Sequence, residues 1–352
     1  MLKYKKNITN IEYVVSPVPI LTTTRTIINS APLQQNSNSI ANIESINGDI
    51  NGLACDDNLS DCSDITSCDT AMHKDHEINV KNGTFHYAIN FVRTFLLKMG
   101  FIECYFENKL GAIAKCNDPF TVCYYFQNNH KHILTQTNRI SLELELMNNS
   151  THVGFFSLSN CYLNDAATGG FNFIPKIEFV MKGGMYDLEK LERDMLFGLG
   201  FKKITGGAYS HIIEKYNFEN LNIDNYKLIN TNEGDVFFLK HFPISLSEQW
   251  NINSNASLNT TNKIIVLING KNIIDSCENS CNKLTMQTQF NSLLNGEYAN
   301  KFNNVFGEIN VKNELAAFLN SNFIIRSSGE INIYNLIGSL LLHKLIPKKF
   351  LH

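Results

Sequence analysis

Two segments in which apolar and polar residues alternate, joined by a polar loop, constrain the fold of this sequence more than any other feature. Residues 152–163 read HVGFFSLSNCYL and residues 173–184 read FIPKIEFVMKGG, with the loop NDAATGGFN between them. Apolar and polar side chains that alternate over this length are typical of strands, and a loop rich in Gly, Asn and Asp favours a hairpin. The sequence therefore predicts a long antiparallel hairpin, and with it a domain built on an antiparallel sheet.

The segments around this hairpin predict helices and further strands. Residues 85–99 carry an apolar stripe at helical spacing and end before a glycine that suits a helix cap, and residues 185–201 repeat this combination. Asn269 and Gly270 form the strongest short turn signal in the chain, so residues 263–275 are expected to form a second hairpin. Further strands are expected at 101–106, 131–137 and 235–242, further helices at 139–147, 284–294 and 311–319, and a final strand and helix at 323–345.

Hairpins interrupted by helices, without regular βαβ alternation, indicate an α+β fold in which an antiparallel β-sheet is flanked by helices.

Composition divides the chain into segments. Residues 31–82 are rich in Asn, Ser and Asp and nearly free of aromatic side chains, so they bury too little apolar surface to offset chain entropy. The prediction is an N-terminal segment at 1–30, a flexible loop or linker at 31–82 and a single domain at 83–352.

The loop at 49–77 contains Asp, Cys and His side chains, and its role stays open. Its cysteines form no tight CxxC pair, so a solvated loop is favoured over a metal site and no metal is predicted. Nine cysteines in the whole chain form an odd, scattered set, which favours reduced thiols. The first residues contain no continuous apolar stretch of the kind found in secretion signals, so a cytoplasmic location is expected. A net charge of −3 argues against a broad nucleic-acid surface. No apolar run approaches the roughly 20 residues that a membrane span needs.

The order of these elements resembles the catalytic core of class II aminoacyl-tRNA synthetases. The segments that carry the resemblance are GFIEC, LTQTNRISLELEL, the hairpin ending in IEFVMKGG, LINGKNIIDSCENSC, and the last strand and helix. The resemblance covers about residues 84–347 and is strongest to the aspartyl and asparaginyl branch and to asparagine synthetase A type ligases. Its most specific piece is residues 275–307, where DSCENSC resembles a GGERSC-like turn that precedes a helix. It implies a class II synthetase-like fold, and a homodimer or a heterodimer with a paralogue.

Three motifs carry the chemistry of that family, and this chain departs from each. Where the first motif ends in proline, this chain has Glu107. Where the second motif has an arginine that holds the α-phosphate, it has Leu163, followed by Asp165 at a glutamate position. Where the third motif has an arginine that grips the γ-phosphate, it has Asn335. An arginine in the GGERSC-like turn is likewise replaced by Asn279.

These replacements weigh against ordinary adenylate chemistry. Neither Leu163 nor Asn335 can make the bidentate, charge-assisted contacts by which a guanidinium orients phosphate oxygens. Removing one charge-stabilising group from a reaction centre typically costs about 10²-fold in rate or more. Glu330, at a glycine position of the third motif, adds repulsion toward a triphosphate. No cofactor is therefore predicted, and ATP with Mg²⁺ is expected only if the protein is a divergent ligase.

Several polar residues at family positions could still bind a ligand, although no catalytic residue is identified. Glu178, Glu278 and Arg326 are retained as candidates, and Arg139 and Lys176 could supply charge stabilisation in a divergent ligase. Two of these residues have a structural alternative. Glu178 would be a solvent-facing strand residue, and Arg326 would pair with Glu330 or another acid.

Three functions remain open at this point. The first is a catalytically degenerate synthetase-like protein that acts as a partner, a regulator or a binder of an amino-acid-like small molecule. The second is a divergent amide-forming ligase of the asparagine synthetase A type. The third is a pocket reused for ATP-independent chemistry on an amino-acid-like substrate. The first 80 residues are too polar and irregular to be a small β-barrel of the kind that tRNA-charging relatives carry, so transfer RNA is not expected as a partner.

Overall fold

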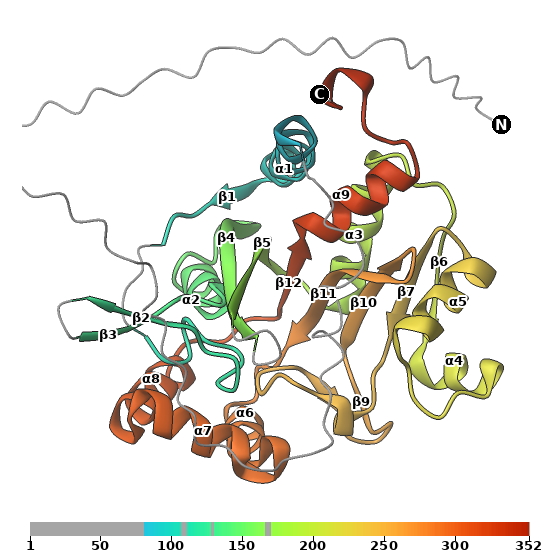
Figure 1. Ribbon diagram of the computed structural model, residues 1–352. Coiled ribbons are helices and arrows are strands. Elements are labelled where there is room, and N and C mark those ends of the chain that lie inside the picture. Colours follow the sequence, from blue (N-terminus) through green and yellow to red (C-terminus); the bar gives the residue numbers. More distant parts are fainter. Residues whose placement is uncertain (1–80, 107–110, 128–129, 166–169, 352) are drawn as a thin grey trace, which may run out of the picture. The chain divides into compact units, whose positions relative to one another are not determined.

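The computed structural model describes residues 81–106, 111–127, 130–165 and 170–351 (Figure 1). The predictions for the segment at 1–30, for the loop at 49–77 and for Glu107 lie outside the described residues. Among the described residues, no helix is long and apolar enough to cross a membrane.

An eight-stranded central sheet organises the described chain, in the strand order β1-β4-β5-β12-β11-β10-β7-β6. The strands in that order are β1 (Phe101–Glu103), β4 (Gly154–Asp165), β5 (Gly170–Lys182), β12 (Arg326–Asn332), β11 (Lys271–Asn279), β10 (Lys263–Ile268), β7 (Val236–Lys240) and β6 (Ile204–Ala208). The inner pairs are antiparallel, as predicted, whereas β1 and β6 lie parallel to β4 and β7 at the two edges. Two short hairpins lie outside this sheet, β2 (Tyr124–Gln127) with β3 (His130–Ile133) and β8 (Ser254–Asn255) with β9 (Thr260–Thr261).

Both predicted hairpins of the central sheet are confirmed. The first is β4 with β5, which pair along their whole length. The second is β10 with β11, whose turn residues Asn269 and Gly270 have φ angles of 54° and 75°. Positive φ at both central residues is the geometry of a type I′ turn, which Asn-Gly sequences favour because it matches the strand twist.

The helices supply the remaining layers. They are α1 (Asn82–Lys98), α2 (Arg139–Asn148), α3 (Met185–Gly198), α4 (Tyr209–Tyr216), α5 (Ile223–Glu233), α6 (Lys283–Ser292), α7 (Glu297–Phe306), α8 (Glu308–Leu319) and α9 (Ile333–Leu342). Helices α4, α5 and α7 were not predicted. Asn side chains have low helix propensity and obscure the pattern in α5, whereas α7 begins only after a left-handed turn at Leu294, Asn295 and Gly296.

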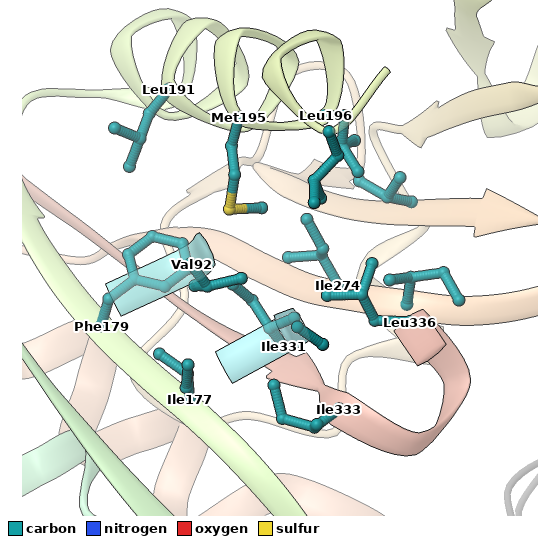
Figure 2. Close-up of a cluster of buried hydrophobic side chains, with 14 of the residues drawn as sticks. Val92, Ile177, Phe179, Leu191, Met195, Leu196, Ile274, Ile331, Ile333 and Leu336 are labelled. Atoms are coloured by element: carbon teal, nitrogen blue, oxygen red, sulfur yellow. The ribbon is translucent and has the colours of Figure 1, made fainter. Parts of the chain in front are cut away.

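Helices α1, α3 and α9 cover one face of the sheet (Figure 1). Figure 2 shows this apolar core, where Leu191 and Met195 of α3 lie opposite Phe179 of β5 and Ile331 of β12. The burial of such side chains is the main favourable term in folding, at about 25 cal/mol per Å² of apolar surface. A second apolar cluster surrounds Trp250 and joins α6, α7 and α8.

Candidate functional site

The face of the sheet opposite this core carries acidic side chains in register. Asp275 of β11 pairs with Glu330 of β12, which pairs with Glu178 of β5, and Ser157 of β4 comes next in line. We refer to these four residues as the polar row. Side chains alternate along a strand, so the polar row points away from the core that contains Ile177. Three carboxylates on adjacent strands about 5 Å apart would repel one another without compensating charge.

Two lysines on neighbouring positions supply much of this compensation. Lys176 Nζ lies 2.6 Å from Glu330 Oε1, and Lys263 Nζ lies 3.0 Å from Asp275 Oδ2. Burial opposes the charge of Lys176, but the neighbouring Cys161 and Glu330 raise its pKa above the ordinary value. Burial also opposes ionisation of Glu330, yet its cationic neighbours hold its pKa below the ordinary value. Lys176 and Glu330 are therefore a charged pair with little exposure to water.

Glu178 is held differently, by neutral donors. Its carboxylate accepts hydrogen bonds from Thr137 Oγ1 at 2.5 Å, from the Asn138 backbone N–H at 2.8 Å and from Ser159 Oγ at 3.0 Å. Burial and then the nearby Glu330 carboxylate raise the pKa of Glu178 above its ordinary value. Glu178 lacks a cationic side chain within ion-pair distance in the described part of the chain.

Arg139 approaches the polar row from the first turn of α2. Its Nη2 donates to Ser328 Oγ at 3.0 Å, to Gln249 Oε1 at 3.1 Å and to Cys277 Sγ at 3.4 Å. Burial raises the pKa of the Cys277 thiol, so that thiol is neutral and a poor nucleophile near neutral pH. Arg139 thus has neutral acceptors and, among the described residues, no carboxylate within ion-pair distance.

Arg326 is fully buried and is engaged by another acid. Its Nε lies 2.7 Å and its Nη2 2.6 Å from Glu143 Oε2, and its Nη1 donates to the Ser280 carbonyl at 3.1 Å. Glu143 Oε1 accepts from the side-chain amides of Asn251 and Asn279. This ion pair joins α2 to β12. Asn279, which stands at a family arginine position, hydrogen-bonds to the same Glu143 carboxylate. Arg326 therefore has a structural role in this arrangement.

Glu278 lies on the other face of β11 from the polar row. Its Oε2 accepts from the backbone N–H of Met185 at 3.0 Å, where α3 begins, and from Asn262 Nδ2 at 3.2 Å. Its Oε1 accepts from Asn253 Nδ2 at 2.6 Å. A carboxylate at a helix N-terminus satisfies free N–H groups and the helix dipole. The structure therefore does not bring Glu278 together with Glu178.

At the positions of the two missing motif arginines, one residue belongs to the central sheet and the other joins a helix to it. Leu163 is half-buried on β4 opposite Asn172, and Asp165 is the last residue of that strand. Asn335, in the first turn of α9, donates from Nδ2 to the Asn272 carbonyl at 2.9 Å and so joins α9 to β11.

Sequence reasoning missed several members of this site. Lys115 is buried and donates to Asn138 Oδ1 at 3.1 Å, and burial lowers its pKa. Glu143, Lys263 and Asp275 were also missed as charged partners. The only available signal was the polar run TQTNR at the start of α2, because the ion pairs join residues that are distant in sequence.

Taken together, the polar row offers limited binding chemistry. Glu178, Arg139 and Lys115 lack an oppositely charged side-chain partner in the described part of the chain. An ammonium group suits Glu178, and a carboxylate suits the two cations. All three are buried, with exposed fractions of 0%, 7% and 6%, so a ligand reaches them only when the covering residues move. Within the described ranges, no group of three or more His, Cys, Asp or Glu side chains is arranged to hold a metal ion.

No family model matches this sequence, and no curated protein matches it. Solved structures do match. Asparaginyl-tRNA synthetase from Pyrococcus horikoshii, complexed with asparaginyl-adenylate, aligns with a TM-score of 0.59 at 11% identity over 74% of this chain and 64% of its own. A putative aspartyl-tRNA synthetase from Leishmania major Friedlin aligns with a TM-score of 0.58 at 12% identity, over 73% and 61%. Asparaginyl-tRNA synthetase from Entamoeba histolytica, in complex with asparaginyl-adenylate, gives 0.55 at 12% identity, over 75% and 65%.

These similarities establish the fold expected from the sequence, that of the class II synthetase catalytic core. At this level of identity they show the fold alone, because one fold supports many functions. The chain also spans less than two thirds of the length of these structures, at 64%, 61% and 65%. The function must therefore be argued from the site.

Proposed function

We propose that this protein is a non-adenylating, class II synthetase-like protein that acts as a partner, a regulator or a binder of a small zwitterionic metabolite. The observation that carries this proposal is the buried Lys176–Glu330 pair at 2.6 Å. Glu330 stands at a glycine position of the third family motif. A carboxylate on β12, paired with a lysine of the neighbouring β5, therefore occupies the place where the resemblance would put nucleotide phosphates.

Charge balance supports the proposal. A nucleotide triphosphate brings several negative charges and needs cations that are free to contact it. Lys176, Lys263 and Arg326 are each held by a carboxylate of the protein. Leu163 and Asn335 supply no charge at the two arginine positions. Few cations of the site therefore remain for phosphate oxygens.

The same balance favours a zwitterion. Glu178 suits an ammonium group and Arg139 suits a carboxylate, and an amino-acid-like molecule carries both. The two residues lie on the same face of the sheet, since Arg139 contacts Ser328, which neighbours Glu330 along β12. Dimer formation with a second copy or with a paralogue is part of the proposal.

The alternative is a divergent amide-forming ligase. Arg139 favours it, because this buried guanidinium has only neutral acceptors in the described residues. That alternative requires ATP and Mg²⁺, and release of pyrophosphate with some amino or dicarboxylic acid.

Titration calorimetry with ATP and Mg²⁺ tests the proposal. We expect no heat of binding for the natural protein. A triple variant, Leu163→Arg with Asn335→Arg and Glu330→Gly, is expected to gain ATP binding, because it restores two guanidinium groups and removes one carboxylate. A matched control makes the same change of net charge at exposed residues, as Leu258→Arg with Asn304→Arg and Glu219→Gln.

Micromolar ATP binding by the natural protein would refute the proposal and favour the ligase. Equal binding by the triple variant and the control would mean that added charge alone attracts ATP. In that case the position of Leu163 and Asn335 has no role in nucleotide binding. Thermal unfolding of each variant shows whether it is folded before it is titrated.

A further inference from the structure

The segments in which helices α3 and α9 end carry lysines and no acidic residue. No Asp or Glu occurs from Met195 to Ile213 or from Ile331 to the last residue, although the chain has 33 acidic residues and a net charge of −3. Five lysines lie in these segments, and all five are exposed: Lys202, Lys203, Lys344, Lys348 and Lys349. We refer to these five residues as the basic patch.

Tertiary packing brings the two parts of the basic patch together. The rings of Phe201 and His343, which directly precede the first and the third of these lysines, pack edge-on with ring centroids 5.2 Å apart. A Cβ on Gly200 would lie 3.0 Å from Leu345 Cδ2. Residues 200–203 therefore lie beside residues 343–345, and the charge of two distant segments gathers on one surface.

The protein itself does not neutralise the basic patch. Among the described residues, no carboxylate lies within ion-pair distance of any of its five lysines. A lysine just after a helix stabilises the helix dipole, which accounts for Lys202 and Lys344 but not for the other three. Like charges gathered on a surface repel one another, so this composition suits an anionic partner that neutralises them.

Two large apolar side chains project into water beside these lysines. Phe197, in the last turn of α3, is 71% exposed, and Leu342, the last residue of α9, is 70% exposed. The Phe197 carbonyl accepts from the Gly200 N–H at 3.1 Å, so Phe197 lies within one turn of the basic patch. Exposed apolar side chains among lysines are typical of proteins that lie on anionic membranes. A nucleic acid would use the lysines alone and leave Phe197 and Leu342 in water.

We propose that this end of the protein binds the surface of an anionic lipid bilayer. The five lysines contact the anionic headgroups, and Phe197 and Leu342 enter the boundary between headgroups and acyl chains. Such binding needs no membrane-spanning helix. It does not depend on the function proposed for the polar row, because that row lies on the sheet face opposite the one that α3 and α9 cover.

Flotation of the full chain with lipid vesicles tests the proposal. We expect binding to vesicles of phosphatidylcholine with phosphatidylserine, loss of that binding as salt rises, and little binding to phosphatidylcholine alone. A lysine close to an anionic surface contributes about fivefold in affinity, so Lys202→Gln with Lys203→Gln is expected to weaken binding about 25-fold. The matched control is Lys283→Gln with Lys312→Gln, which removes two exposed lysines from α6 and α8.

A second pair of substitutions separates a membrane from other anionic partners. Phe197→Ser with Leu342→Ser keeps every charge and is expected to weaken vesicle binding about tenfold or more. Its control is Leu258→Ser with Leu284→Ser, which changes two similarly exposed apolar residues outside this surface. Both control variants should bind vesicles as the natural protein does.

Absence of binding to vesicles that contain phosphatidylserine would overturn the proposal, and so would equal weakening by the lysine variant and its control. Binding that depends on the lysines but not on Phe197 and Leu342 would also overturn it, and would indicate another polyanion such as a nucleic acid. All the substituted residues are exposed, and the unfolding midpoint of each variant shows whether the fold is intact.

Discussion

The two faces of the central sheet are built from the same strands yet follow opposite chemistry. On β5, Ile177 and Phe179 point into the core covered by α1, α3 and α9, while Lys176 and Glu178 point to the other side. On β12, Ile331 joins the core and Glu330 joins the polar row. The four side chains named on β5 are nearly or fully buried, and so is Ile331, so burial alone does not distinguish the faces.

The difference lies in what stabilises each face. On the apolar face, each side chain contributes in proportion to the area it buries, and neighbours can adjust to a change. On the polar face, each charged group depends on a particular partner, and removal of one partner leaves a buried charge uncompensated. A single substitution that removes one charged partner should therefore lower the stability of the protein more than the removal of both partners together.

The largest effect is expected for Arg326→Met on the polar face. This substitution leaves Glu143 buried without its cation, and should lower the free energy of unfolding by about 3–5 kcal/mol. Urea denaturation measures it. The double variant Arg326→Met with Glu143→Leu should recover a large part of this loss, because it removes the uncompensated charge. Additive losses in the double variant would contradict the view that pairing stabilises this face.

Phe179→Ala is the matching test on the apolar face. Phe179 is 1% exposed and packs in the helix-covered core, so its truncation leaves a cavity and should cost about 3–4 kcal/mol. The loss should be the same at pH 5 and pH 8, since no charge is involved. A loss that varies strongly with pH would show that Phe179 shields the polar face.

Glu192 on α3 is an exception that sharpens the comparison. This carboxyl is 1% exposed on the apolar side, and neither of its oxygens has a hydrogen-bond partner among the described residues. Burial raises the pKa of Glu192 to about 8, with repulsion from Glu189 and Asp275 adding to this rise and the nearby Ser276 hydroxyl opposing it. The native protein therefore holds it as the neutral acid at pH 7, whereas in the unfolded chain it ionises with its ordinary pKa of 4.5.

The sign of the pH dependence follows from this pKa. Between pH 4.5 and about 8 the unfolded state loses the Glu192 proton first, so rising pH destabilises the fold by up to about 1.4 kcal/mol per pH unit. Glu192→Gln removes this term. Relative to the natural protein, the stability of the variant should rise across that window, by about 3 kcal/mol between pH 4 and pH 7, and the difference should level off above pH 8.

Denaturation at a series of pH values measures this difference. Glu189→Gln is the control with the opposite sign. Burial opposes ionisation of Glu189, but Lys240 and Arg193 hold its pKa below the ordinary value, so its loss should destabilise the protein at neutral pH and have little effect at low pH. A stability difference for Glu192→Gln that does not change with pH would show that this carboxyl is hydrated in the native state.

Much of the fold could be predicted because its signals are local. Alternation predicted the β4–β5 hairpin, the Asn269–Gly270 pair predicted the turn of the β10–β11 hairpin, and apolar stripes predicted α1 and α3. Where the signal was weak, as in the Asn-rich α5, the element was missed. Tertiary packing decides such segments, because several of their residues have no strong preference of their own.

The candidate site was less predictable, because the role of each charged residue depends on which other side chain it contacts. Glu178 and Glu278 looked equivalent in sequence, yet one belongs to the polar row and the other binds the start of α3. For Arg326 the sequence left open a ligand or a pairing with Glu330 or another acid, and only the structure identifies the acid as Glu143, which is 183 residues away in sequence.

The sequence by itself determined the secondary-structure pattern, the resemblance in element order and the absence of two motif arginines, because each is a property of neighbouring residues. Only the tertiary structure decided which charged groups are paired and which face of the sheet each occupies. Strand register and helix packing bring distant residues within ion-pair distance, and no local pattern encodes those contacts. The binding chemistry of this protein depends on those tertiary contacts.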